Sequence, residues 1–134
     1  MRKLAFLSLL LMLGVCYRAQ SQQPTKAIRA KIEATELDRR MLLQKLNIHG
    51  QDHHMRFESA ESDYDYRIIF STGQGTTQTT YGELNSSLAS ADVFDPQETE
   101  LFRFDRKGRG SDQRATDAVA KEIIKRIAIL NKLH

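Results

Sequence analysis

The chain has 134 residues, with 20 Lys and Arg, 17 Asp and Glu, and a single cysteine, Cys16. Its formal net charge of +3 comes from Arg2, Lys3 and Arg18, because the first 21 residues contain no acidic side chain and the other 113 carry 17 basic and 17 acidic ones. That balance excludes the strongly basic domain expected of a nucleic-acid-binding protein. After residue 21 the chain has the length of one domain with one hydrophobic core, and it has no cysteine for a disulfide or a metal.

Residues 1–21 have the layout of a secretory signal peptide. Arg2 and Lys3 precede an apolar run over residues 4–15, and Ala19 and Ser21 are the small residues before a cut after Ser21. The apolar run is shorter than the about 20 residues that a membrane-spanning helix needs. We therefore expect an exported protein, periplasmic or extracellular, whose single domain covers residues 22–134.

Cys16 offers an alternative. Leu13 and Gly14 before it are similar to the start of a bacterial lipobox, although Val15 stands where that motif has Gly, Ala or Ser. In this alternative Cys16 is the mature N-terminus and carries lipid, so that the protein is anchored to a membrane. Only then is a membrane an expected partner.

The first element expected after the leader is a helix over about residues 26–46, with Thr25 as its N-cap and Gly50 just beyond its end. The expectation rests on apolar residues that recur every three or four positions: Ala27, Ala30, Ala34, Leu37, Met41, Leu42, Leu43 and Leu46.

From His53 onward the apolar period changes to two, which predicts strands over residues 55–58, 64–71 and 77–81 with a turn over residues 71–76. Residues 88–94 and 100–106 flank Asp95-Pro96-Gln97-Glu98, where Pro96 suits the second position of a turn, and form the clearest hairpin. Residues 107–110 are expected to be a loop, after which Ser111 or Asp112 caps the last helix.

The last helix, over about residues 112–133, has the strongest pattern. Val119, Ile123, Ile127 and Leu130 follow one face, flanked by Ala120 and Ile124. Asp117 with Lys121 and Glu122 with Arg126 are spaced for ion pairs along the helix. The order of elements predicts an α+β fold: an N-terminal helix, an antiparallel sheet of four to five strands and a C-terminal amphipathic helix, with both helices on one face.

Few residues suggest chemistry. His49, Asp52, His53 and His54 are of metal-ligating types, but Gly50 is expected to interrupt the helix and the adjacent His53 and His54 to point to opposite faces of a strand. We therefore expect no metal and no cofactor. The alternative left open is a small secreted metal-binding protein or hydrolase that uses this cluster.

No other pattern supports catalysis. Gly73-Gln74-Gly75 lacks the Lys of a phosphate-binding loop and the third Gly of a dinucleotide fingerprint. No Ser, His and acid set has a spacing typical of a nucleophile. We expect a protein that is not an enzyme.

One basic stretch is the candidate binding surface. It surrounds the predicted loop at residues 107–110 and could meet anionic lipid headgroups, cell-wall polymer or an acidic protein. Its members are Arg103, Arg106, Lys107, Arg109 and Arg114.

Residues 89–96, 100–104 and 118–124 together resemble a pattern in small bacterial envelope proteins, in which a strand, an Asp-containing turn, a returning strand and an Ala-rich helix close the domain. The order is similar to the small α/β domain of envelope lipoproteins such as the penicillin-binding-protein activators and the curli-secretion lipoproteins. Residues 63–69 resemble the Asp-Tyr segment that opens their sheet, while Glu98 or Thr99 stands where they commonly have Gly. The resemblance implies a non-enzymatic role in envelope assembly, with an envelope protein or cell-wall component as partner.

Overall fold

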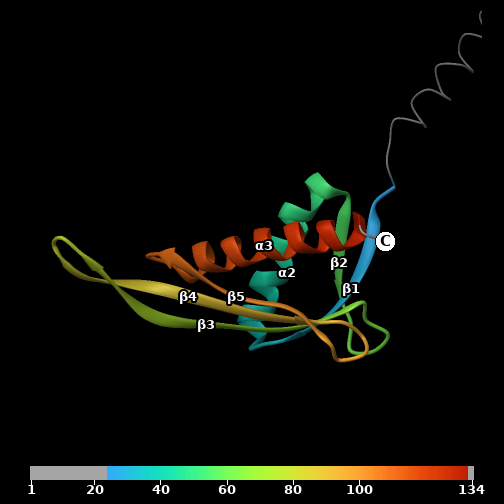
Figure 1. The fold of residues 1–134 in the computed structure, drawn as a ribbon, viewed down its shortest axis with the longest axis horizontal. Helices are drawn as coiled ribbons and strands as arrows, with labels where there is room; N and C mark the ends of the chain where they lie inside the picture. Colours follow the sequence, from blue (N-terminus) through green and yellow to red (C-terminus); the bar gives the residue numbers. More distant parts are fainter. Residues whose placement is uncertain (1–23, 133–134) are drawn as a thin grey trace, which may run out of the picture.

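The computed structural model describes residues 24–132, apart from the side chains of Thr77 and Arg109. It is an α+β fold, as predicted, with two helices on one face of a five-stranded sheet (Figure 1). In chain order the elements are β1 (Lys26–Glu33), α2 (Glu36–Gly50), a 3-10 turn η1 (Gln51–His53), β2 (Met55–Ser59), β3 (Tyr66–Thr79), β4 (Gly82–Phe94), β5 (Glu100–Arg109) and α3 (Asp112–Lys132).

The sheet has the strand order β2-β1-β3-β4-β5. β1 is parallel to both of its neighbours, whereas β4 is antiparallel to both β3 and β5. The prediction of an antiparallel sheet is therefore wrong for the pairs that β1 forms with β2 and with β3. The reason is that residues 26–33 enter the sheet as a strand between β2 and β3.

The prediction of a helix over residues 26–46 is thus wrong for residues 26–35, nearly half of its length. The alanines that recur at helical spacing overlap a period of two, in which Ile28, Ala30 and Ile32 are buried and the residues between them are more exposed. β-branched isoleucine at the buried positions favours a strand.

The helix itself, α2, begins after Thr35 and not after Thr25. The Thr35 Oγ1 accepts a hydrogen bond from the backbone N–H of Asp38 at 3.3 Å, as expected of an N-cap. Its last residue is the predicted stop Gly50, where a Cβ would lie 2.8 Å from the carbonyl oxygen of Met55. Glycine at this position therefore allows β2 to pass close to the helix end.

Two predicted loops are wrong for a common reason. Gly73 and Gly75 lie inside β3, opposite Leu88 and Ser86 of β4, and the turn of this hairpin comes later, at Thr80-Tyr81. Residues 107–109 likewise continue β5. In both places a long antiparallel ladder outweighs the weak strand preference of glycine.

The hairpin at residues 95–99 and the last helix are confirmed. Val119, Ile123 and Ile127 are fully buried, and Leu130 packs against the core in part. The predicted ion pairs are present, from Lys121 to Asp117 at 3.2 Å and from Arg126 to Glu122 at 2.9 Å.

The core lies between the helices and one face of the sheet. Inward residues of all five strands meet Leu42 and Leu46 of α2 and the buried face of α3 in one apolar cluster. The ends of β3 and β4 extend beyond the helices as a bare hairpin (Figure 1), whose tip exposes Tyr81 completely and Leu84 by 61%.

The predicted leader and Cys16 lie outside the described residues. Neither helix of the described part is long and apolar enough to cross a membrane.

Candidate binding surface

The face of the sheet that neither α2 nor α3 covers is the candidate functional site. Because side chains alternate along a strand, the residues between the buried ones point to this face. Strand pairing arranges them in rows across the sheet. One row consists of Lys31, Arg67 and Phe94. The next row consists of Glu33, Ile69, Asp92 and Arg103. We call this surface of the sheet the open face.

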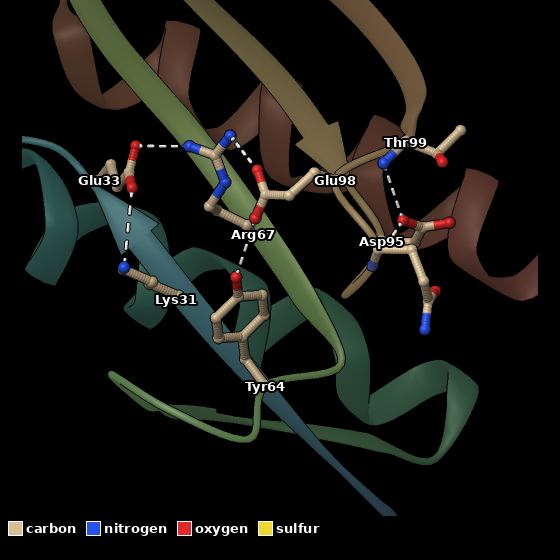
Figure 2. A network of polar contacts seen from close by, with 8 residues as sticks. Lys31, Glu33, Tyr64, Arg67, Asp95, Glu98 and Thr99 are labelled. Atoms are coloured by element: carbon tan, nitrogen blue, oxygen red, sulfur yellow. Dashed lines mark hydrogen bonds and ion pairs between the residues drawn. The ribbon is translucent and has the colours of Figure 1, made fainter.

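Arg67 is the centre of a polar network at one end of the open face (Figure 2). Its guanidinium contacts Glu33 at 2.9 Å and Glu98 at 2.7 Å, and it stacks over the ring of Phe94 at 4.6 Å from the centroid. The side chain is only 18% exposed. Burial opposes its charge, but the two carboxylates prevail and raise the pKa of Arg67 above its usual value.

Tyr64 and Lys31 extend this network to the chain before β3. The Tyr64 hydroxyl donates to Glu98 at 3.1 Å, and the carboxylate that accepts this bond raises the pKa of Tyr64. Lys31 lies 3.9 Å from Glu33 and over the Tyr64 ring at 5.9 Å. Four separate parts of the chain are thereby fixed to one another.

Glu98 reaches Arg67 from a turn with unusual backbone geometry. Its φ is 66°, in the left-handed region that favours glycine. The carboxylate of Asp95 holds the turn by accepting hydrogen bonds from the backbone N–H groups of Gln97, at 3.0 Å, and Thr99, at 2.9 Å. Glu98 is one of the two positions, with Thr99, at which Gly was expected from the resemblance to envelope lipoprotein domains; here it adopts the left-handed backbone and its side chain contacts Arg67.

Next to the network, the open face has a shallow hollow of about 450 Å³. Its lining includes Ile69, which is 38% exposed, and Arg103, whose Nε lies 3.1 Å from Asp92. Ser71, Ser90 and Asp105 complete the polar rim. The hollow therefore combines apolar surface with charges of both signs.

The basic stretch predicted from the sequence is divided in space. Arg103 and Lys107 belong to the open face, whereas Arg106 points to the helix side, 3.5 Å from Glu122. Arg114 lies on α3, and the side chain of Arg109 is outside the description. A role for these five residues as one binding surface stays a prediction.

The histidine cluster is also divided. His49 points from α2 to α3, with its Nε2 2.6 Å from Asp117, while His53 and His54 are exposed. Within residues 24–132, no three His, Cys, Asp or Glu side chains are placed to hold a metal ion. The alternative of a small secreted metal-binding protein or hydrolase stays a prediction.

Sequence reasoning missed Arg67 because nothing in the spacing joins it to its partners. Glu33 and Glu98 lie more than 30 positions away on either side and meet Arg67 only through the strand order. The available signal was a lone arginine between the apolar positions of a predicted strand.

No protein-family model matches the chain, and no curated protein matches it in sequence. Several solved structures have a similar fold, among them the following three. A minor lipoprotein from Acinetobacter baumannii has 12% identity over 80% of this chain and 95% of its own, with a TM-score of 0.45. Uncharacterized lipoprotein B from Nitrosomonas europaea has 11% identity over 81% and 86%, with a TM-score of 0.47.

The third is a PelC dodecamer from Paraburkholderia phytofirmans, with 12% identity over 77% of this chain and 88% of its own and a TM-score of 0.46. The similarity is thus to small bacterial lipoproteins and to PelC. None of the three is a penicillin-binding-protein activator or a curli-secretion lipoprotein, so that narrower resemblance stays a prediction.

Proposed function

We propose that the protein is an exported, non-enzymatic binding module of a bacterial envelope, and that its open face binds another envelope protein. The observation that carries the proposal is the arrangement of that face. The helices cover one side of the sheet. The other side presents ordered rows of charged residues and the partly exposed Ile69 at a hollow.

The chemistry of the open face favours a protein as partner. A polyanion such as an acidic cell-wall polymer would be bound best by charges of one sign. Here Arg67 and Arg103 alternate with Glu33 and Asp92, and both arginines already contact carboxylates. Protein interfaces commonly have a polar rim around an apolar centre, and Ile69 would be that apolar centre here.

A pair of matched substitutions tests this proposal. Ile69→Asp puts a charge at the hollow, and Leu37→Asp makes the same change at a 74% exposed position of α2, on the other side of the sheet. Photo-crosslinking from Ser71 in envelope fractions of the source bacterium should yield one adduct with the wild-type protein and with Leu37→Asp. The adduct should be lost with Ile69→Asp, and equal yields from all three would reject the open face as the binding surface.

Export is proposed together with this function. A mature chain that begins at Gln22 follows from Ala19 and Ser21 at the end of the leader. The intact mass of the protein purified from its host measures this directly. A mass for a diacylated chain starting at Cys16 would replace the soluble form by a lipid-anchored one, and a mass that includes Met1 would contradict export with cleavage.

A further inference from the structure

The two edges of the sheet differ. On the outer edge of β2, the side-chain amide of Asn47 closes the strand: its Nδ2 donates to the carbonyl oxygen of Phe57 at 3.2 Å, and its Oδ1 accepts from the Phe57 N–H at 2.8 Å. An edge closed in this way cannot accept a further strand without losing both bonds.

The other edge, β5, is open and longer, with ten residues. Arg106 of this strand donates a hydrogen bond to the backbone carbonyl oxygen of its neighbour Asp105 at 2.8 Å. An open edge presents unpaired N–H and C=O groups, to which another strand can be added. Arg103, Asp105 and Lys107 alternate on the open-face side of this edge.

From this edge we infer that two copies of the chain pair through β5, antiparallel and around a two-fold axis through Phe104, to form one continuous sheet. With the axis perpendicular to the sheet, Arg103 stands opposite Asp105 of the second copy, and Asp105 opposite Arg103 of the second copy. Opposite charges that face each other across antiparallel strands stabilise the pair. On the helix side, Phe104 meets Phe104 of the second copy.

The charges select this register over its neighbours. A two-fold axis through Arg103 places Arg103 opposite itself, and an axis through Asp105 places Asp105 opposite itself and Arg103 opposite Lys107. Like charges directly opposite one another destabilise a strand pair. An axis through Phe104 also lies near the middle of residues 100–109, so that it pairs almost the whole strand.

The side chains of β5 on the helix side of the sheet are compatible with this pairing. Phe102 and Phe104 are only 8% exposed, because Arg126 of α3 lies over both rings, at 5.5 and 5.2 Å from their centroids. Arg106 lies 5.2 Å from the centroid of Phe104 and would stand opposite Phe102 of the second copy. The two paired β5 strands would therefore have arginine against aromatic rings on the helix side of the sheet and ion pairs on the open face.

Charge reversal and its rescue test the inference. Sedimentation equilibrium of the protein purified from the envelope, over a wide range of concentration, should show a monomer–dimer equilibrium. Asp105→Arg puts like charges opposite each other twice and should weaken the dimer by about tenfold or more. Adding Arg103→Asp to that variant restores opposite charges in both pairs and should restore the dimer. Asp52→Arg makes the same charge change on exposed η1 and should leave it unchanged.

A wild-type protein that stays monomeric would overturn the inference, as would an Asp105→Arg protein that dimerises as well as the wild type. Failure of the double variant to recover, with its melting temperature unchanged, would also contradict the proposed register. Arg103 and Asp105 also line the hollow of the open face, but the two tests remain distinguishable because sedimentation measures self-association, whereas the Ile69→Asp test measures a crosslink to another protein and leaves the β5 edge intact.

Discussion

Asp117 joins the two helices through a single carboxylate. It accepts the contact from His49 of α2 at 2.6 Å and lies 3.7 Å from Lys45 of the same helix and 3.2 Å from Lys121 of its own. Burial by itself opposes ionisation of this group. The hydrogen bonds from His49 and Lys121 prevail and hold the pKa of Asp117 below its usual value of 3.8.

This lowered pKa predicts a pH dependence of stability. The charged Asp117 stabilises the folded state above the unfolded pKa of 3.8, and that contribution is lost as the pH falls through the lower folded pKa. Asp117→Asn should therefore lower the melting temperature at about pH 6, and the difference from wild type should shrink between about pH 4 and pH 2. Thermal melts across this range measure it. Asp52→Asn is the matched control, and a gap that widens as the pH falls would contradict the assignment.

Asp95 has a comparable role at the turn before β5. Asp95→Ala removes the acceptor for the N–H groups of Gln97 and Thr99 and frees a turn that holds Glu98 at a φ of 66°. We expect a loss of about 1–2 kcal/mol in the free energy of unfolding. Denaturant unfolding measures this, with Gln97→Ala, an exposed side chain in the same turn, expected to stay within about 0.5 kcal/mol of wild type. Equal effects of the two substitutions would show that the carboxylate does not hold the turn.

At the scale of elements, two glycines inside strands differ in their surroundings: Gly108 lies where a strand and a helix approach closely, and Gly73 does not. Gly108 lies where β5 passes under the first turn of α3: a Cβ there would collide with the backbone nitrogen of Ala115 and lie 2.9 Å from the carbonyl oxygen of Ser111. Gly73, also inside a strand, has no atom within 4 Å of such a Cβ.

The pair gives a direct comparison. Gly108→Ala forces β5 and α3 apart and should cost about 1–3 kcal/mol, the usual range for overpacking. Gly73→Ala replaces a poor strand former in open space and should be neutral or stabilise by up to about 1 kcal/mol. Denaturant unfolding of the two variants decides between them. A Gly108→Ala protein as stable as Gly73→Ala would mean that the contact between β5 and α3 is loose.

How far the sequence predicts the elements depends on what specifies each one. α3 and the hairpin at Asp95 follow from local signals, a long apolar stripe and a turn sequence, and both are found where predicted. β1 fails because alanines fit periods of two and of three to four equally well, and only pairing with distant β2 and β3 decides. The network around Arg67 could not be predicted for the same reason, since strand order brings Glu33 and Glu98 together.

At the scale of the whole molecule, one face of the sheet is apolar and covered by the helices, and the other face is polar. The helices and the inward strand residues enclose the core, while the open face and the β5 edge lie outside it. Both proposals depend on this division, because an open face exists only if α3 is firmly packed on the opposite side of the sheet.

The packing of α3 is therefore the most general prediction to test. Ile123 is fully buried in the middle of the stripe, so Ile123→Asp buries an unpaired carboxylate and also loses apolar burial. Either effect alone costs a few kcal/mol out of a total stability of about 5–15 kcal/mol, and the variant should be unfolded or degraded.

Lys125→Asp, two residues further and exposed, should change the free energy of unfolding by no more than about 0.5 kcal/mol. Matched thermal melts compare the two variants. If Ile123→Asp melts close to the wild type, α3 is not held by the core, the sheet is free on both faces, and the distinction between a covered face and an open face no longer holds. If only Ile123→Asp loses its cooperative transition, the helix layer is what stabilises the sheet and leaves its other face available for binding.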